Sequence, residues 1–316
     1  MGMDNAAVMA QFQKDFMGVG KLKAGGLMNP TQANKFIRMM QDEPTLLNDV
    51  RTERMNSDNQ VFDKIGFGER VLRPAKEFTP LADSEKAVAK TGKIELSAKE
   101  VIAEINISDD MIENNIEGKS VTDTIVELLA KQAAMDIEEL IINGDIDSSD
   151  SYLALFNGLL KQSQSHIVDL QGGAINKDAF KNAIKAVPSR YRKNIADHRF
   201  YVSHNNVMEW KDSVVARQTA LGDNALVNAG HPAAYGAPIK GVANLNPFAF
   251  GEEGLEASNG LFVHPKNIIV GISRKIRLEM ERDIRARGFI FVLTMKLDSK
   301  FEEEEASAKI VNIKED

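Results

Sequence analysis

Hydrophobic and polar residues alternate along two stretches in the first third of the chain. Residues 61–71 and 93–107 both show this period of two, which is typical of strands. In the first stretch Val61 begins the apolar parity, and the second changes parity near Lys99, which predicts a β-bulge or a join between two strands. The residues between the stretches are rich in charge and contain two prolines. The pattern therefore predicts a long β-hairpin with a broad polar tip, and because a two-stranded ribbon is marginal in water, it needs a partner surface.

A helical period follows from about Val121 to Asn143. Apolar residues recur there at every fourth position, with two more widening the face: Ile125, Leu129, Ala133, Ile137 and Ile141, then Leu128 and Leu140. Ser120 with Asp123 resembles a capping box, and Gly144 supplies a stop. Such a helix would be roughly 34 Å long at 1.5 Å per residue. It is expected to be the support around which other parts pack.

The later residues predict a mixed α/β region and then a sheet. The expected elements of the α/β region are a helix with the apolar face Phe180, Ile184 and Val187, a strand over 199–203 and a helix over about 206–217. The glycine- and alanine-rich residues 222–241 are expected to form a loop. Alternation over 276–295 and 309–313 predicts a sheet that returns to cover the long helix.

The first fifty residues are expected to form an arm rather than a domain. Val8, Phe12 and Phe16 recur at every fourth position, and Phe36 and Met40 belong to the apolar face of a second short helix. Two short helices cannot bury a core by themselves. Their apolar faces are therefore expected to lie on another surface.

Composition narrows the class of protein. The chain has 316 residues, 43% of them hydrophobic and 27% charged, which is enough for a sizeable core. A formal charge of −7 and a pI of about 5.4 argue against a wholly basic nucleic-acid-binding face, although a local basic patch remains open. The absence of cysteine excludes disulfides, thiolate metal sites and cysteine nucleophiles. Without a signal peptide or an apolar run of about 20 residues, the chain is expected to be soluble and cytoplasmic at synthesis.

Motifs that carry chemistry are weak throughout. The five histidines have no metal-ligand spacing, and neither a phosphate-binding loop nor a GxSxG elbow occurs. Asp145, Asp147 and Asp150 fail the calcium-loop pattern, which needs Gly at 150 and Glu at 156. We therefore expect no catalytic, cofactor-binding or metal-binding residues, no cofactor and no enzymatic activity.

Charges of both signs intersperse along the expected hairpin. Mixed signs on a protruding ribbon fit contact with another protein better than contact with a uniform phosphate backbone. With the apolar arm positions, this gives the candidate inter-subunit contacts: Val8, Phe12, Phe16, Phe36, Met40, Arg73, Lys76, Glu77 and Lys86.

The order of these parts resembles the major capsid proteins of tailed phages with the HK97-type fold, over nearly the whole chain. Several stretches are similar to that family, none of them catalytic: 104–113 before the long helix and 138–145 at its end, then 157–160, 235–239, 264–267 and 277–283. Their order and spacing carry the resemblance.

The resemblance implies an α+β class, an HK97-like capsid fold with N-arm, extended β-hairpin loop, long spine helix in a peripheral domain, and an α/β axial domain. The expected division is an N-terminal arm over 1–50, the extended loop and its base over 51–107, a first part of the peripheral domain over 108–165 with the spine helix at about 121–143, an axial domain over 166–255, and a second part of the peripheral domain, the returning sheet, over 256–316.

The function implied by the resemblance is structural. Such subunits form pentamers and hexamers of an icosahedral shell around phage double-stranded DNA, which is only loosely contacted. Further expected partners are a portal protein and separate scaffold or decoration proteins, with no membrane; the expected location is the virion capsid, assembled in the host cytoplasm. Two alternatives stay open: an encapsulin-type cellular nanocompartment shell protein, and more remotely a soluble α+β enzyme with an unrecognised site.

Overall fold

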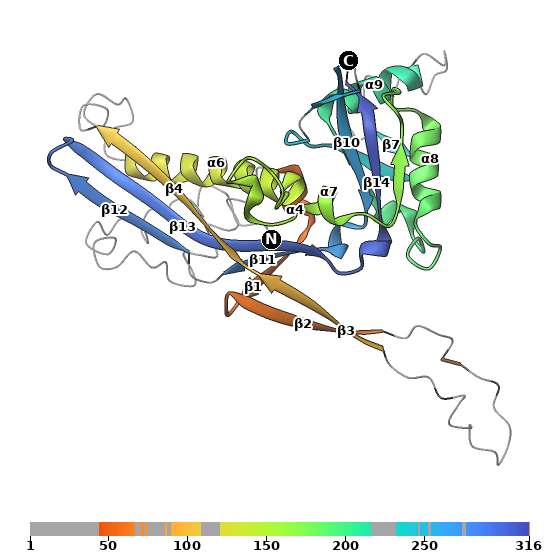
Figure 1. The fold of residues 1–316 in the computed structure, drawn as a ribbon, viewed down its shortest axis with the longest axis horizontal. Helices are drawn as coiled ribbons and strands as arrows, with labels where there is room; N and C mark the ends of the chain where they lie inside the picture. The colour runs from red at the N-terminus through yellow and green to blue at the C-terminus, as the bar shows by residue number, and fades with distance from the viewer. Residues whose placement is uncertain are drawn as a thin grey trace, which may run out of the picture.

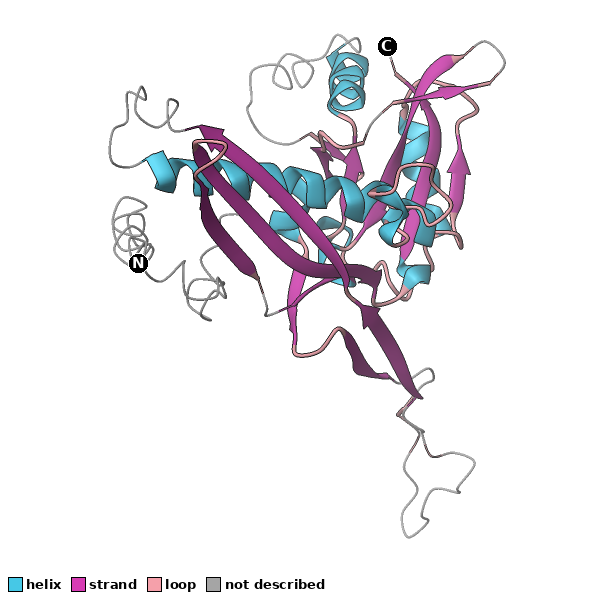
Figure 2. Ribbon diagram, turned by 60° about the vertical axis from the view of Figure 1, so that its left-hand side comes forward, coloured by secondary structure: helices cyan, strands magenta, loops and turns pink. Residues whose placement is uncertain are grey.

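A computed structural model of the chain describes residues 44–66, 71, 72, 74, 86, 90–108, 121–215, 232–245, 247–251, 254–273 and 276–315. These residues form two lobes side by side, with a two-stranded ribbon projecting from the first lobe (Figure 1). In the first lobe a long helix lies along a sheet, and in the second lobe two helices cover a sheet (Figure 2).

The sheet of the first lobe has five described strands. They are β1 (Arg51–Met55), β11 (Ile268–Ser273), β13 (Gly288–Phe301) and β12 (Arg277–Asp283) in that order, with β4 (Lys99–Ser108) also paired to β13. β1 runs parallel to β11, and the other pairs are antiparallel.

Short helices are found in both lobes and in the crossings between them. They are α4 (Thr45–Asp49), α7 (Leu159–Gln162) and the 3-10 helices at Leu153–Leu155, Ile195–Asp197, Pro265–Asn267 and Glu304–Ala306.

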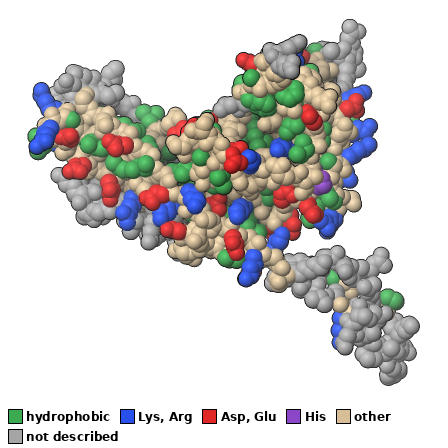
Figure 3. All heavy atoms as spheres, viewed as in Figure 1, with side chains coloured by type: hydrophobic (Ala, Val, Ile, Leu, Met, Phe, Trp, Pro, Cys, Tyr) green, Lys and Arg blue, Asp and Glu red, His purple; other side chains and the backbone are tan. Residues whose placement is uncertain are grey.

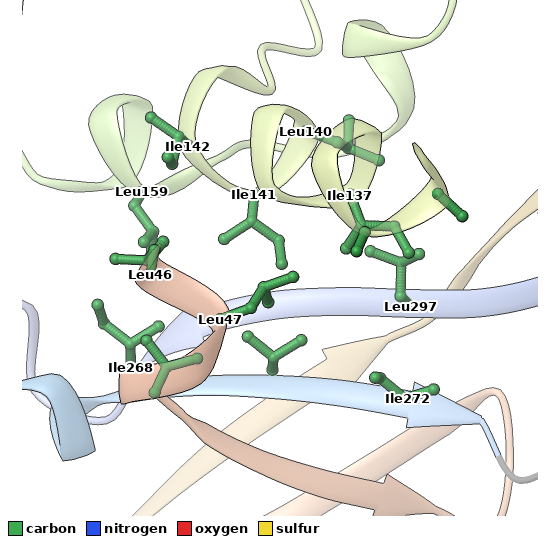
Figure 4. Close-up of a cluster of buried hydrophobic side chains, with 14 of the residues drawn as sticks. Leu46, Leu47, Ile137, Leu140, Ile141, Ile142, Leu159, Ile268, Ile272 and Leu297 are labelled. Atoms are coloured by element: carbon green, nitrogen blue, oxygen red, sulfur yellow. The ribbon is translucent and has the colours of Figure 1, made fainter. Parts of the chain in front are cut away.

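Helix α6 (Val121–Asn143) has the bounds that its apolar spacing predicts, and it packs on the sheet through that face. Figure 4 shows Ile137 and Ile141 pointing from α6 toward Leu47 of α4 and Leu297 of β13. Leu129, Ala133, Ile137, Leu140 and Ile141 are buried, but Leu128 is 60% exposed, so its assignment to the apolar face is wrong. At 100° per residue, position 128 points away from the arc that the buried residues share.

The second lobe has a seven-stranded sheet among the described residues. Its order is β5 (Ile167–Asp169), β14 (Ser307–Lys314), β10 (Leu255–Val263), β6 (Arg199–Val202), β8 (Ala237–Gly241) and β7 (Ala233–Ala234), with β9 (Phe248–Phe250) also paired to β10. Helices α8 (Lys177–Ala186) and α9 (His204–Val215) cover one face, where Phe180 meets Phe200 and Trp210 edge-on. On the other face Tyr201 and Leu261 join the cluster that contains α6, so that cluster connects the two lobes, while the second lobe keeps a core of its own around Phe180.

Two expectations about this region need correction. Residues 222–241 are not all loop, because β7 and β8 lie within them and the alternating Ala237 and Ile239 are buried. Residues 256–316 do not all return to the long helix: β11, β12 and β13 do, whereas β10 and β14 pair with each other in the second sheet. The chain crosses between the lobes at 264–267 and again at 302–306.

The ribbon consists of β2 (Asn59–Gly66) and β3 (Lys90–Ser97), paired antiparallel. This confirms the predicted hairpin, and the parity change near Lys99 is a join, since β3 ends at Ser97 and β4 begins at Lys99. The parity that begins at Val61 is not the side of the ribbon that packs within the chain. Phe62 lies opposite Ile94 in the register and packs with it, which leaves Val61 on the exposed side.

Candidate functional site

Of the nine contact candidates from the sequence, only Lys86 lies among the described residues, and it is exposed. Val8, Phe12, Phe16, Phe36, Met40, Arg73, Lys76 and Glu77 lie outside them. The candidate site must therefore be built from the described ribbon and the faces of the two lobes.

A small apolar cluster, separate from the cores of the lobes, holds the base of the ribbon. Leu96 of β3 is buried there with Met55 of β1 and Ile269 of β11, and Phe62 packs against them. Gly271 makes this possible because a side chain would meet Leu96 and Met55, each 2.7 Å from where its Cβ would stand. The cluster, which we call the ribbon base (Met55, Ile94, Leu96, Ala98 and Ile269), fixes where the ribbon leaves the first lobe.

Polar contacts reinforce the ribbon base. The buried carboxylate of Asp298 accepts a hydrogen bond of 2.7 Å from the Ser97 N–H. Lys64 of β2 forms an ion pair of 2.6 Å with Glu303, and its Nζ also donates to the Glu302 carbonyl. These contacts join β3 to β13 and β2 to the crossing at 302–306, so the ribbon has a defined direction where it projects from the first lobe (Figure 1).

The outer face of the first sheet carries an apolar row that sequence reasoning did not select. Ile102 is 69% exposed and lies opposite Thr294. Val292 and Ile290 continue the row along β13, and carboxylates border it: Glu104 on β4, then Glu279 and Glu281 on β12. The available signal was an isoleucine on the polar parity of an alternating strand, since Val101 and Ala103 face the core.

A second exposed apolar position lies in the turn between β12 and β13. Ile284 is 83% exposed there, beside the exposed Arg285 and Arg287. An isolated exposed hydrophobic residue is ordinary. Together with the row around Ile102, however, it places apolar surface at one end of the first lobe.

Buried and half-buried polar groups join the long helix α6, the short helix α4 and the second lobe. Glu138 of α6 is 1% exposed and accepts a hydrogen bond of 2.6 Å from the Leu46 N–H at the start of α4. Asn244 Nδ2 donates to the Met135 carbonyl at 2.8 Å and to Glu138 at 3.3 Å. Nearby, the Asp49 carboxylate accepts from the Tyr201 hydroxyl at 2.9 Å and pairs with Lys240 at 2.7 Å. These contacts hold α4 against α6 and the second lobe.

Burial raises the pKa of Glu138 above its ordinary value, although hydrogen bonds from the backbone N–H groups of Leu46 and Leu47 act to lower it. An acid with a raised folded-state pKa favours folding most below its unfolded-state pKa, and this contribution is lost as pH rises through the folded-state pKa. We expect Glu138→Gln to remove this loss of stability. Between the unfolded-state and folded-state pKa of Glu138, the free energy of unfolding of the variant should therefore change less steeply with pH than that of the wild type. Urea unfolding of the unassembled subunit from about pH 4 to about pH 8 measures it. Glu139→Gln on the same helix is the control, and equal pH slopes for Glu138→Gln and the wild type would contradict the assignment.

The described residues show no group of His, Asp and Glu side chains that could hold a metal ion. The acidic loop after α6 is engaged internally: Lys161 bonds Asp145 at 2.9 Å and Asp147 at 3.2 Å, and this contact holds the pKa of Asp145 below its usual value. His198 and His264 meet edge-on at 5.4 Å, while His198 stacks on Phe262, and burial lowers the pKa of His198. Among the helices in the described ranges, none has the length and hydropathy of a membrane span.

Comparisons with known proteins agree with this architecture. The model of the phage capsid family matches residues 24–237. YqbE of Bacillus subtilis (strain 168), a protein named for a prophage capsid, is 52% identical over 301 residues, covering 95% of this chain and 96% of its own length.

Solved structures share the fold at low sequence identity. The procapsid of satellite phage P4 aligns with a TM-score of 0.68 and 13% identity over 96% of this chain and 98% of that one. The capsid of Ralstonia phage GP4 gives 0.61 and 10% identity over 85% and 88%. The SrpI encapsulin from Synechococcus elongatus PCC 7942 gives 0.57 and 9% over 85% and 87%.

A long helix laid along a sheet, a projecting ribbon and a second α/β lobe, shared with these shells, define the HK97-like capsid fold of the α+β class. The chain belongs to the phage capsid family. It is a phage major capsid protein, a structural component of the virion capsid.

Proposed function

We propose that copies of this chain assemble into hexamers and pentamers that tile an icosahedral shell around double-stranded DNA. The observation that carries this is the ribbon: it is anchored at its base but projects away from both lobes (Figure 1). A ribbon of two strands gains little stability alone, so a neighbouring subunit is its natural support. The row around Ile102 offers neighbours a further apolar surface.

We propose a division of the chain that keeps the sequence-based roles and adjusts one boundary. Residues 1–50 serve as the arm, 51–107 as the extended loop and its base, and 108–165 as the first part of the peripheral domain. Residues 166–255 form the axial domain, joined by β10 and β14, and the rest of 256–316 is the second part of the peripheral domain. The sheet pairings support this adjustment.

The proposed partners follow from the role of a shell subunit. They are other copies of the chain, a portal protein, separate scaffold or decoration proteins, and DNA; assembly would take place in the host cytoplasm, without enzymatic activity. An encapsulin-type shell has the same fold. The family match and the 52% identical prophage relative favour the phage role.

The direct test is expression of the chain alone, followed by size-exclusion chromatography and negative-stain electron microscopy. We expect closed shells, tubes, or free rings of five and six subunits. A compact monomer that stays monomeric even when the neighbouring genes are co-expressed would contradict the proposal.

A further inference from the structure

A row of lysines runs along the exposed side of helix α8. Lys177, Lys181 and Lys185 stand at every fourth position, about 6 Å apart along the axis, and all three are exposed. The turn that follows adds Arg190, Arg192 and Lys193. Figure 3 shows Lys and Arg side chains gathered on the right-hand edge of the second lobe, over α8, on the side away from α6. We call Lys177, Lys181 and Lys185 the α8 lysine row.

The charge of this segment runs against that of the whole chain. Residues 177–193 contain six basic residues and one acidic residue, Asp178, in a chain of formal charge −7. None of the three lysines forms an ion pair with another described residue. In the following turn Arg190 pairs with Glu305, and Arg192 Nε is buried without a hydrogen-bond partner. The row therefore presents positive charge that the described part of the fold leaves uncompensated.

The same surface lacks what a protein interface requires. The apolar side chains of α8, led by Phe180 and Ile184, are buried in the core of the second lobe. The other exposed side chains here are polar, such as Asn182 and Ser189, and no large exposed hydrophobic residue in the described ranges lies between 177 and 199. Interface cores are depleted in lysine and enriched in aromatic residues. The α8 lysine row fits an anionic polymer better than the surface of another subunit.

We propose that the α8 lysine row contacts the phosphates of double-stranded DNA, and that this side of the second lobe faces the interior of the shell. The inference rests on the proposed function. Duplex DNA carries one negative charge per about 1.7 Å of axis, and lysines bind it without reading sequence by releasing condensed counterions. A few contacts per subunit give weak, salt-sensitive binding that many copies repeat. Such contacts keep the genome close to the wall without holding it tightly.

The test measures DNA binding as a function of salt. Unassembled subunits are titrated with a fluorescent duplex of random sequence at several salt concentrations, for the wild type and for Lys177→Gln/Lys181→Gln/Lys185→Gln. Gln keeps helix propensity and removes charge. Since each phosphate contact contributes about 0.9 to the slope of log affinity against log salt, we expect that slope to fall by about 2.7 in the triple variant.

The matched control removes three exposed lysines elsewhere, in Lys93→Gln/Lys99→Gln/Lys266→Gln. It changes net charge equally but leaves the α8 lysine row intact, so its slope is expected to stay near the wild-type value. Equal slopes for the two triple variants would overturn the proposal, because they would show a response to net charge only.

Assembled particles separate this inference from the proposed function. Failure of the wild-type chain to form shells or rings counts against the proposed function, whatever its affinity for DNA. If the wild type assembles, acetylation of the row should be slower in DNA-filled particles than in emptied ones. Equal acetylation in filled and emptied particles would overturn the proposed DNA contact. A variant of the α8 lysine row that loses assembly but keeps its DNA affinity would also overturn it. That result would assign the row to contact with an acidic surface of a second copy.

Discussion

Replacing Gly158 with alanine is expected to cost about 3 kcal/mol or more of folding stability. A Cβ at this position would stand 2.6 Å from the Gly144 nitrogen and 2.7 Å from the Ile141 and Ile142 carbonyl oxygens. All three neighbours are backbone atoms at the end of α6, so no side-chain rotation relieves the clash. The two segments are held at this short distance by a hydrogen bond of 2.7 Å, which the Gly158 N–H donates to the Gly144 carbonyl.

Thermal unfolding and soluble yield of Gly158→Ala measure this loss. Gly92→Ala is the control, because the three atoms nearest to its new Cβ all belong to the side chain of Lys64, which can shift, and we expect it to lose less than about 1 kcal/mol. A Gly158→Ala protein that melts at the wild-type temperature would show that the backbone crossing can open at little cost.

Local patterns in the sequence predicted the elements well and their partners less well. The bounds of α6 and the join near Lys99 follow from periodicity, which depends only on neighbours in the chain. The membership of β10 and β14 in the second sheet depends on pairing between residues such as Leu261 and Lys309, far apart in sequence. Alternation over 61–71 separates two sides of the ribbon but does not tell which of them packs within the chain; the register of Phe62 with Ile94 decides that.

The residues of the candidate site also differ in how far the sequence could have predicted them. Periodicity could have selected Ile102, since an apolar residue on the polar parity of a strand is a visible anomaly. The spacing of the α8 lysine row is also present in the sequence, but only the fold shows that this side of the helix is exposed and free of apolar residues. The buried joint around Glu138 had no local signal, because its partners Leu46 and Asn244 lie about a hundred residues away on either side.

Introducing a charge into the ribbon base is expected to abolish shell formation while both lobes stay folded. Leu96 is 1% exposed, and Leu96→Asp would place a carboxylate beside Met55 and Ile269, at a local cost of about 3 kcal/mol or more. The ribbon base is separate from the clusters that hold the lobes. Loss of the apolar contacts in the ribbon base should therefore detach the ribbon while the two lobes stay folded.

Limited proteolysis, thermal unfolding and electron microscopy together distinguish this result from general unfolding. For Leu96→Asp we expect faster cleavage between residues 59 and 97, a main unfolding transition close to that of the wild type, and no shells or rings. Thr91→Asp on the same strand is the control, because Thr91 is exposed and its change leaves the ribbon base intact. Shells at wild-type yield from a Leu96→Asp protein with a cleavable ribbon would mean that subunits recognise one another through the lobes alone. In that event the row around Ile102, rather than the ribbon, would be the surface on which assembly depends.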